Sequence, residues 1–253
     1  MAAISVGILG CGFVGGALKQ WLEEHNPEIG VLISDPAKGY NDDLSGADVI
    51  FLSIHLVTDD DGSQNIAILK DIIDTLPDKP IFIRTTILPG SSEKLSKACG
   101  KKVYFMPEFL TERTAYQDFC TQPMIFTGEF ELLEKIFVGK KHVRMSSTEA
   151  EIAKYAHNVF GALKVSYFNC VAEMCRNMGA VYDNVKEGVL LSGYISPEHT
   201  KVPGPDGKFG YGGKCFPKDV DAFTEFAKGL MLHELLKEVK PINEKFRNES
   251  NDS

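Results

Sequence analysis

The 253-residue sequence contains no long hydrophobic segment and no excess of basic residues. No apolar run approaches the roughly 20 residues that a membrane-spanning helix needs, and the N-terminus begins with a strand pattern rather than a signal peptide. The formal net charge of -8 argues against a general binder of nucleic acids or anionic membranes, which needs basic patches. We therefore expect a cytosolic (cytoplasmic) protein with no nucleic-acid or membrane partner. Local cations are sufficient for an anionic substrate.

The cysteines do not suggest a metal or disulfide framework. They stand at positions 11, 99, 120, 170, 175 and 215, without a CxxC pair or a His/Cys cluster of metal-ligand spacing. We interpret all six as free thiols and expect no metal. Cys170 and Cys175 fall in a predicted helix and are expected in the core. The sequence also lacks internal repeats, and only the polar tail at residues 248–253 is expected to fray.

The order of the predicted elements indicates an α/β protein. A hydrophobic share of 43% and a charged share of 25% are ordinary globular values. Strand and helix patterns alternate up to about residue 145, as a doubly wound parallel sheet requires. Only thirteen residues separate Asp35 from Val49, so we expect one element of the usual sheet to be reduced. The predicted strands are 6–9, 31–34, 49–54, 81–84, 103–106, 124–127 and 143–145, and helices are predicted at 66–76 and 91–98.

After Met145 the pattern becomes helical. Thr148 and Glu151 form a capping-box signature, and residues 149–178 follow without proline, which predicts one long central helix. Further helices are predicted at 219–229 and 231–247, with Pro241 kinking or dividing the second. Apolar residues at helical spacing in the long helix are expected to be mostly core: Ile152, Ala156, Val159, Phe160 and Leu163.

A glycine-rich turn follows the first predicted strand. The motif Gly10-Cys11-Gly12-Phe13-Val14-Gly15 permits a tight turn and close approach to a pyrophosphate at a helix N-terminus, and Cys11 is expected to pack beneath it. Asp35 stands twenty residues after Gly15, where a carboxylate binds an adenosine ribose and repels a 2'-phosphate. The pattern therefore favours NAD over NADP, with Lys38 as the one nearby residue that weakens this preference.

We expect a Rossmann-type NAD-binding domain at residues 1–146 and a mostly α-helical substrate and dimerisation domain at 147–253.

A second glycine-rich loop ends at a cysteine. Gly210, Gly212 and Gly213 lead to Cys215, and Pro217 marks a helix start directly after it. A helix N-terminus favours the thiolate and lowers the pKa of a cysteine, and Lys218 adds positive charge. Asp219 follows four residues after Cys215 and is expected on the same helical face. The pattern predicts a reactive thiolate rather than a buried structural cysteine.

Lys154 and Asn158 stand four residues apart in the predicted long helix and therefore share one face. Their spacing alone fits a surface lysine with an indifferent neighbour, and leaves that alternative open.

These motifs, in this order, resemble the UDP-glucose and GDP-mannose dehydrogenase family over nearly the whole chain. The resemblance rests on the dinucleotide turn, the segments 85–90 (Thr-Thr-Ile-Leu-Pro-Gly) and 107–112 (Pro-Glu-Phe-Leu-Thr-Glu), the helix segment from Glu151 through Asn158 to Asn169, and the Cys215 loop. The family oxidises the C6 alcohol of a nucleotide sugar to a carboxylate in two hydride transfers to NAD. The resemblance implies that activity here, with UDP-glucose as the first expectation, and a homodimer formed through the long helix.

The resemblance also implies roles for individual residues. Cys215 matches the nucleophile that forms a thiohemiacetal and then a thioester, and Lys154 and Asn158 match the pair that steadies oxyanions. Asp219 and Thr86 match residues that orient a water or the reacting hydroxyl, and Thr86 also lies along the cofactor. Glu108 matches a general base for thioester hydrolysis, with Glu112 near substrate and cofactor; their alternative is a pair of surface carboxylates. The sugar is expected to meet Glu108, Phe109, Leu110, Lys154, Asn158 and the backbone of Gly210, Gly212 and Gly213.

The sequence departs from the family pattern in several places. The chain stops at Ser253, where the family usually continues into a second nucleotide-binding domain that binds much of the nucleotide diphosphate. We therefore expect a short form whose substrate identity and affinity for the nucleotide differ from those of the family. Other departures are the segment 54–57 (Ile-His-Leu-Val), Leu88, Thr111 and Lys214. Two rival functions remain. One is a β-hydroxyacid dehydrogenase with a single oxidation, which needs no cysteine. The other is a non-catalytic NAD-binding subunit that depends on a partner.

Overall fold

The computed structural model describes residues 4–56 and 64–249. Its strands are β1 (Ser5–Leu9), β2 (Gly30–Asp35), β3 (Tyr40–Asn41), β4 (Val49–Leu52), β5 (Ile81–Ile83), β6 (Val103–Phe105), β7 (Met124–Phe126) and β8 (His142–Arg144). Its helices are α1 (Phe13–His25), α2 (Ala67–Thr75), α3 (Ser91–Cys99), α4 (Ala115–Thr121), α5 (Phe130–Ile136), α6 (Ser147–Met178), α7 (Tyr182–Leu190), α8 (Phe216–Phe226), α9 (Met231–Leu236) and α10 (Val239–Glu249), with 3-10 turns η1 (Pro36–Lys38) and η2 (Leu44–Gly46).

Two compact units make up the described chain. Unit 1 holds residues 4–56 and 64–154, and unit 2 holds residues 155–249. The division falls within α6, so this helix contributes to both units.

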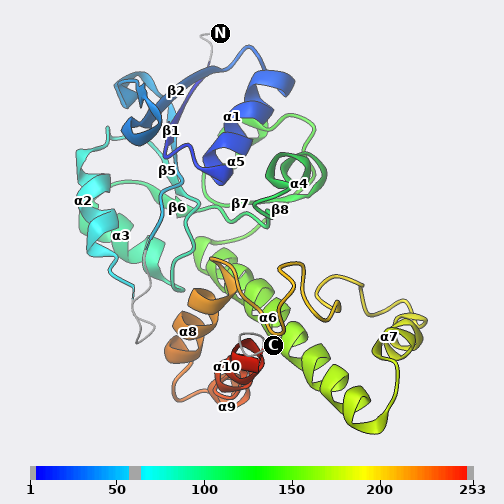
Figure 1. Cartoon of the computed structure of the whole chain (residues 1–253). Helices are drawn as coiled ribbons and strands as arrows, with labels where there is room; N and C mark the ends of the chain where they lie inside the picture. The colour runs from blue at the N-terminus through cyan, green and yellow to red at the C-terminus, as the bar shows by residue number, and fades with distance from the viewer. Residues whose placement is uncertain (1–3, 57–63, 250–253) are drawn as a thin grey trace. The chain divides into compact units, whose positions relative to one another are not determined.

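Unit 1 is built on a six-stranded sheet with the order β3-β2-β1-β4-β5-β6 (Figure 1). Its strands run parallel except β3, which is antiparallel to β2. The predicted parallel α/β sheet is therefore confirmed, and η1, β3 and η2 fill the short interval after Asp35 where one element was expected to be reduced. The strands predicted at 124–127 and 143–145 also form, but β7 and β8 pair with each other in a separate two-stranded sheet.

The core of unit 1 lies on both faces of the sheet because neighbouring residues of a strand point to opposite sides. Phe51 and Phe82 face the cluster that includes α1, α4 and α5. Ile50 and Ile83 face the cluster that includes α2 and α3. All four side chains are fully buried, and burial of one such side chain stabilises a fold by roughly 1.5–3 kcal/mol. Figure 1 shows these two groups of helices on opposite sides of the strands.

Side chains bind the outer backbone groups at both edges of this sheet. Beyond the two-residue strand β3, the Asp42 carboxylate accepts a hydrogen bond from the Ile33 N–H at 2.8 Å. At the other edge, the Ser147 hydroxyl oxygen accepts from the Phe105 N–H at 3.1 Å, and the Thr127 hydroxyl donates to the Phe105 carbonyl at 2.8 Å. These backbone groups of β2 and β6 are thereby paired without a further strand.

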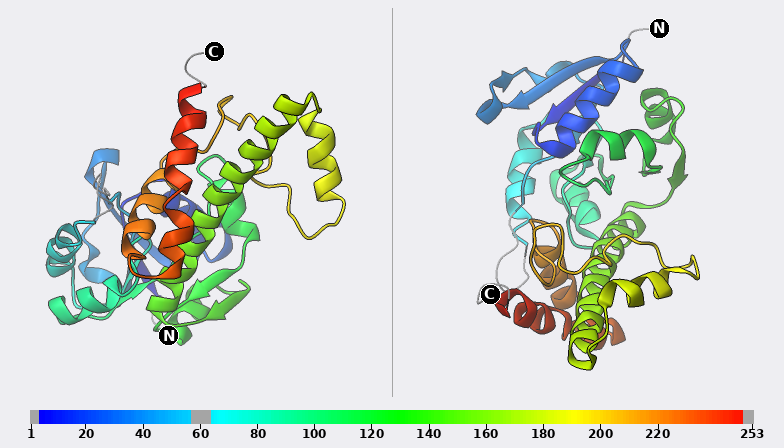
Figure 2. Two further views of the ribbon diagram at one scale, coloured as in Figure 1. Left: turned by 90° about the horizontal axis from the view of Figure 1, so that it is seen from below. Right: turned by 45° about the vertical axis from the view of Figure 1, so that its right-hand side comes forward.

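Unit 2 is helical. The helices α8, α9 and α10 gather on one side of α6, and α7 lies at its C-terminal end (Figures 1 and 2). The long helix predicted at 149–178 is confirmed by α6. The second C-terminal helix is divided as expected, but α9 ends before α10 begins at Val239, so the break precedes Pro241. Residues 248 and 249 of the polar tail belong to α10, and residues 250–253 lie outside the described chain.

Two expectations about α6 are wrong. The reciprocal cap at its N-terminus is formed by Ser146 and Glu149 rather than by Thr148 and Glu151. The Ser146 N–H and hydroxyl donate to the Glu149 carboxylate, and the Glu149 N–H donates to the Ser146 hydroxyl oxygen. The predicted apolar face is also only partly buried. Val159 is buried, whereas Ile152 is 46% and Phe160 is 65% exposed, so α6 packs against the core over a narrower face than the apolar spacing indicates.

Short helices were also missed. The sequence patterns did not predict α4, α5 or α7, which have no side-chain hydrogen bond at their N-caps. Within residues 4–56 and 64–249, no helix is long and apolar enough to cross a membrane, and no group of three or more His, Cys, Asp and Glu side chains is arranged to hold a metal ion.

Candidate active site

The glycine-rich turn of unit 1 connects β1 to α1. Gly10 has a positive φ of 86°, and a Cβ there would lie 2.6 Å from the Ser53 carbonyl oxygen. A Cβ on Gly15 would lie 2.0 Å from the Gly10 carbonyl oxygen. The turn itself therefore requires these two glycines. Gly12 is different, because its Cβ would meet nothing within 4 Å, which leaves open space where a ligand can approach the backbone.

Asp35 lies at the end of β2 and is bound to the same turn. Its Oδ2 accepts a hydrogen bond from the Cys11 N–H at 2.8 Å, and the Lys38 amine donates to the Cys11 carbonyl at 2.6 Å. Lys38 is thus an exposed residue tied to the turn, and Cys11 is buried as expected. The acidic and the basic group that were expected to set the cofactor preference both lie at this turn.

Two cavities adjoin the turn. One of about 580 Å³ is lined by Gly12, Phe13 and Glu112, together with the N-terminal part of α4. It brings together Gly12 and Phe13, which the glycine-rich motif assigned to the cofactor, and Glu112, which the family resemblance placed near it. The other, of about 640 Å³, is lined by Leu9, Ile54 and the two neighbours of Asp35 in the chain. Both cavities are large enough for parts of a dinucleotide.

The loop after β5 carries Thr86. Gln64 fixes this loop, because its side-chain amide donates to the Thr86 carbonyl at 3.4 Å and accepts from the Leu88 N–H at 3.1 Å. The Thr85 hydroxyl donates to the Ile54 carbonyl at 2.6 Å. Thr86 is therefore held at the carboxyl ends of the parallel strands, where ligands of such sheets bind. His55 is exposed, and Val57 of the departing segment 54–57 lies outside the described residues.

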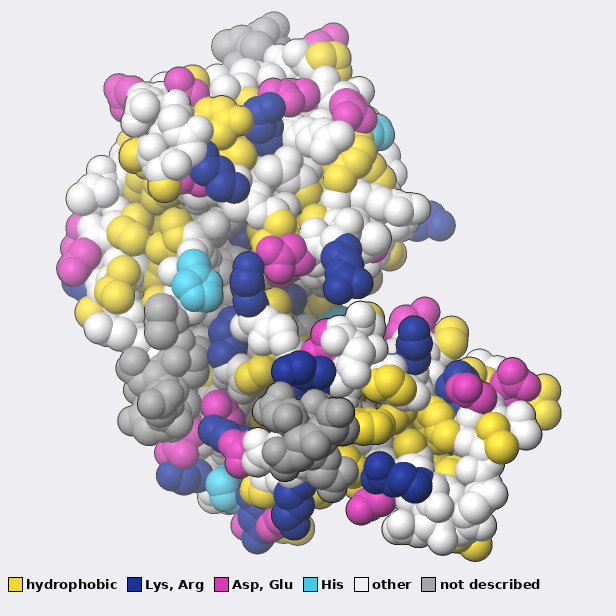
Figure 3. Space-filling view, in the orientation of Figure 1, with side chains coloured by type: hydrophobic (Ala, Val, Ile, Leu, Met, Phe, Trp, Pro, Cys, Tyr) yellow, Lys and Arg dark blue, Asp and Glu magenta, His cyan; other side chains and the backbone are white. Residues whose placement is uncertain are grey.

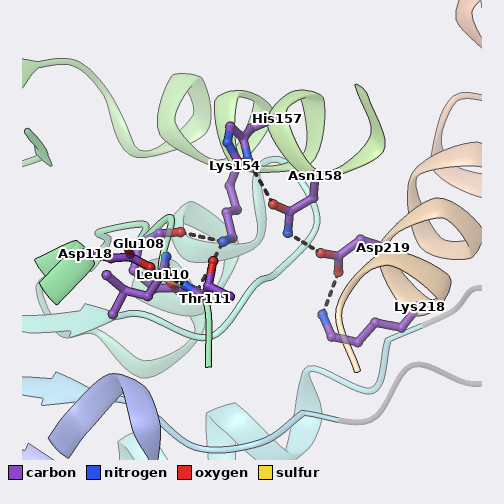
Figure 4. Close-up of polar contacts among 9 residues, drawn as sticks. All are labelled: Glu108, Leu110, Thr111, Asp118, Lys154, His157, Asn158, Lys218 and Asp219. Atoms are coloured by element: carbon purple, nitrogen blue, oxygen red, sulfur yellow. Dashed lines mark hydrogen bonds and ion pairs between the residues drawn. The ribbon is translucent and has the colours of Figure 1, made fainter. Parts of the chain in front are cut away.

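Lys154 and Glu108 form a buried ion pair within unit 1. Their side chains are 6% and 9% exposed, and the Lys154 Nζ lies 3.2 Å from the Glu108 Oε1. The amine also donates to the Glu108 carbonyl and lies 5.4 Å from the centre of the Phe109 ring (Figure 4). The other oxygen of Glu108 accepts from the Leu110 N–H at 2.6 Å. The alternatives of a surface lysine and of a surface carboxylate at Glu108 are thus wrong, while Glu112 is exposed.

Asn158 follows Lys154 by one turn of α6 and binds a different carboxylate. Its side-chain amide donates to Asp219 Oδ2 at 2.6 Å, and Lys218 Nζ lies 2.5 Å from Asp219 Oδ1 (Figure 4). Asn158 is 5% exposed and Asp219 is fully buried. Because the Asp219 N–H donates to the Cys215 carbonyl at 3.0 Å, this carboxylate connects α6 to the first turn of α8.

Cys215 is the N-cap residue of α8, with Pro217 in the first turn, as predicted. Its side chain is exposed, in contrast to the buried Cys11 and Cys175 and the partly buried Cys99, Cys120 and Cys170. The thiol therefore stands where a helix N-terminus favours negative charge and where a ligand has access to it.

Two buried amides hold the glycine loop before Cys215. The Asn169 side-chain oxygen accepts from the Gly210 N–H at 3.0 Å. Asn243 on α10 accepts from the Tyr211 N–H at 2.6 Å and donates to the Tyr211 carbonyl at 3.1 Å. The Gly210 N–H is therefore already engaged within the protein. Sequence reasoning missed Asn243, because a single asparagine in an amphipathic helix carries no signal of burial.

The glycines of this loop are explained by α10. A Cβ on Gly210 would lie 2.5 Å from the Asn243 side-chain oxygen, and one on Gly212 would lie 2.6 Å from the Arg247 guanidinium. Gly213 meets nothing within 4 Å but has a positive φ of 78°. Arg247 is fixed in turn by a 2.7 Å ion pair with Asp206. Side chains larger than hydrogen would displace the loop from α10.

Comparison with known proteins gives these residues a context. Residues 148–245 match the profile of the UDP-glucose/GDP-mannose dehydrogenase family, central domain. A UDP-glucose 6-dehydrogenase of Rickettsia felis is 30% identical over 75% of this chain and 46% of its own length. One from Bacillus subtilis is 29% identical over 81% of this chain and 50% of its own length. The chain thus spans about half the length of the curated relatives it matches.

Solved structures agree at the level of the fold. A UDP-glucose dehydrogenase from the archaeon Pyrobaculum islandicum has a TM-score of 0.78, with 23% identity, 96% coverage of this chain and 68% of that chain. A UDP-D-ManNAc dehydrogenase from Pyrococcus horikoshii has a TM-score of 0.74, with 20% identity, 96% coverage of this chain and 69% of that chain. At these identities the likeness establishes an α/β domain followed by a helical domain.

Proposed function

Because this chain belongs to the UDP-glucose/GDP-mannose dehydrogenase family, we propose that it oxidises the C6 alcohol of a nucleotide sugar to a carboxylate with NAD. The observation that carries the proposal is the pair Lys154 and Asn158 on successive turns of α6. Each is buried and each is already bound to a carboxylate, Glu108 and Asp219 respectively. A buried cation and amide of this kind suit the stabilisation of a developing oxyanion.

The turn from Gly10 to Gly15 would hold the cofactor together with Asp35 and Thr86. The open space at Gly12 and the adjoining cavities fit a dinucleotide, and the N-terminus of α1 suits its pyrophosphate. The negative charge of Asp35 favours NAD over NADP. NAD, when bound, supplies the hydride acceptor for both oxidations.

The protein's own residues then carry the remaining chemistry. The Cys215 thiolate adds to the carbonyl carbon of the C6 aldehyde, and the C–S bond persists through the second oxidation as a thioester. Lys154 and Asn158 donate hydrogen bonds to the oxygen on C6, while Asp219 and Thr86 orient the reacting hydroxyl or water. Glu108 accepts a proton from the water that attacks the thioester. The C–S bond then breaks, and the thiolate and the carboxylate product separate.

We propose UDP-glucose as the first substrate to test, because the relatives with about 30% identity carry that name. Phe109 and Leu110 would meet the sugar beside Glu108, and the backbone of Gly210, Gly212 and Gly213 would meet it beside Cys215. We also propose that the NAD-binding domain ends at residue 146 and that the substrate-binding domain begins at residue 147.

A homodimer is proposed through α6. Phe160, Tyr167, Met174 and Met178 follow at spacings of seven, seven and four and so share one helical face. They are 65%, 61%, 54% and 76% exposed. Figure 3 shows hydrophobic side chains gathered over the part of unit 2 that contains α7, near the end of α6. A second copy of the chain would cover this stripe.

The test of the activity is the yield of NADH from UDP-glucose and, in parallel, from GDP-mannose. We expect two NADH per sugar from the wild type. Cys215→Ser should lower the rate by about three orders of magnitude, while Cys99→Ser on α3, a partly buried thiol outside the site, should leave it unchanged. One NADH per sugar with full activity in Cys215→Ser would instead indicate a single oxidation. Intact NAD binding without turnover would indicate a subunit that needs a partner.

A further inference from the structure

Arg84 is a buried cation that the proposed reaction does not use. It follows β5, its N–H donates to the Leu52 carbonyl at 2.8 Å, and the residue is only 2% exposed. Its guanidinium lies 5.3 Å from the centre of the Phe119 ring. In the part of the chain that the structure describes, its Nε and Nη1 are buried and have no hydrogen-bond partner. Buried donors of this kind are rare and call for an explanation.

A small cavity connects Arg84 with Glu108. The cavity has a volume of about 20 Å³, and its walls include Arg84, Glu108, Asp118 and Gln122 among apolar side chains. This volume is about that of one water site. Asp118 Oδ2 accepts hydrogen bonds from the Thr111 N–H and the Thr114 hydroxyl, both at 2.8 Å. Glu108 is bound by Lys154 and by the Leu110 N–H, and it is the wall carboxylate whose charge stabilises the Arg84 cation.

The lysine side chains near Arg84 bind other groups. Lys154 pairs with Glu108. Lys140 lies 5.4 Å from the centre of the same Phe119 ring, but its amine donates to the Phe119, Cys120 and Gln122 carbonyls at the end of α4. Burial lowers the pKa of Arg84 to about 10, and Glu108 opposes this shift. Arg84 is therefore positively charged at neutral pH and interacts with the Glu108 carboxylate.

The proposed reaction requires a second positive charge beside Glu108, and Arg84 supplies one. When Lys154 also donates to the substrate oxyanion, its single positive charge is shared between that oxyanion and the Glu108 carboxylate. The Glu108 side chain is only 9% exposed, and burial with only part of a countercharge favours protonation of such a group. A protonated Glu108 cannot accept a proton from the attacking water. A second cation beside it removes this conflict.

We propose that Arg84 is a positioning residue that keeps Glu108 ionised when Lys154 also binds the substrate oxyanion. It acts directly or through one water in the cavity that the two side chains share. This inference rests on the proposed function, in which Glu108 is the base for thioester hydrolysis. It adds to that function the element that allows Lys154 and Glu108 to work in the same step.

The first experiment follows the pH dependence of NADH formation in Arg84→Met and Arg84→Lys. In Arg84→Met, the acid limb of the kcat profile should shift to higher pH by about one unit or more, because the cation is lost. The KM for NAD should not show a matching change. Arg84→Lys should keep the wild-type profile. The control is Lys97→Met, which removes an exposed cation from α3. If Arg84→Met does not fold, Arg84→Gln removes the charge and keeps a polar side chain.

The second experiment needs no turnover. Lys154→Met removes the charge that Lys154 places beside Glu108, and infrared difference spectra against the corresponding Glu108→Gln variants isolate the Glu108 carboxyl band. We expect Glu108 to be ionised at pH 7 in Lys154→Met and protonated in Lys154→Met combined with Arg84→Met. Equal ionisation in both proteins, or an unchanged kcat profile in folded Arg84→Met, would overturn the inference. Absence of turnover in the wild type would overturn only the proposed function, and the infrared titration would still decide the effect of Arg84.

Discussion

Two glutamates only two positions apart on α6 lie in opposite environments. Glu149 is exposed, and hydrogen bonds from the N–H and hydroxyl of Ser146 lower its pKa. Glu151 is fully buried and accepts hydrogen bonds from the Gly90 N–H at 2.5 Å and the Ser92 N–H at 2.9 Å, yet burial outweighs them and raises its pKa. One glutamate caps α6, and the other caps the start of α3.

This contrast predicts pH dependences of opposite sign. The folded protein binds the Glu151 proton more tightly than the unfolded chain does, so the contribution of Glu151 to stability falls as pH rises from its ordinary value of 4.5. Relative to Glu151→Gln, the wild type should therefore lose stability over that rise. The measurement is the free energy of unfolding in urea at several pH values.

Glu149→Gln provides the matched comparison. Its lowered pKa means that its contribution is present above 4.5 and is lost as pH falls through the lowered value. Relative to Glu149→Gln, the wild type should lose stability on acidification. The same slope in both comparisons would contradict the roles assigned to the two residues.

These two residues also show how much of the site the sequence could predict. A Ser or Thr followed three residues later by Glu occurs both at Ser146 and Glu149 and at Thr148 and Glu151, so the local pattern cannot choose between them. The choice depends on the contact of Glu151 with residues 90–92, which are distant in sequence. In contrast, the placement of Cys215 at a helix start was predicted correctly, because Pro217 marks that start locally.

At the scale of elements, α10 fixes the loop that leads to Cys215. Asn243→Ala should remove the hydrogen bonds that the Asn243 side chain makes to the Tyr211 N–H and carbonyl. Loss of these bonds should lower the free energy of unfolding by about 1–3 kcal/mol. Amide hydrogen exchange should rise in peptides that cover residues 204–214. Asn248→Ala, an exposed asparagine on the same helix, should change stability by less than about 0.5 kcal/mol. Unchanged exchange in Asn243→Ala would show that Asn169 alone holds the loop.

The elements that the sequence predicted share strong local signals. The buried strands β4 and β5 are continuous apolar runs, and α6 has a regular apolar pattern over many turns. The missed helices α4 and α5 have seven residues each and no side-chain cap. Their stability comes from packing, as at Phe119 and Leu133, which belong to the core cluster that includes α1. Packing between distant segments leaves no local trace in the sequence.

At the scale of the whole molecule, the exposed stripe on α6 predicts self-association. Tyr167→Glu would place a charge in the proposed interface and should weaken the dimer by about 2 kcal/mol or more. Sedimentation velocity at micromolar concentration should give twice the mass of one chain for the wild type and one chain for the variant. Asn177→Glu adds the same charge about a quarter turn away from the stripe and should remain dimeric. A monomeric wild type would refute the dimer.

The side-chain pairing of backbone groups in β2 and β6 has a consequence for aggregation. An open strand edge is a template on which another chain can add a strand. Here Asp42 occupies the backbone N–H of Ile33 at one edge, and Ser147 and Thr127 occupy the backbone of Phe105 at the other. These N–H and carbonyl groups are therefore not available for β-strand addition between molecules.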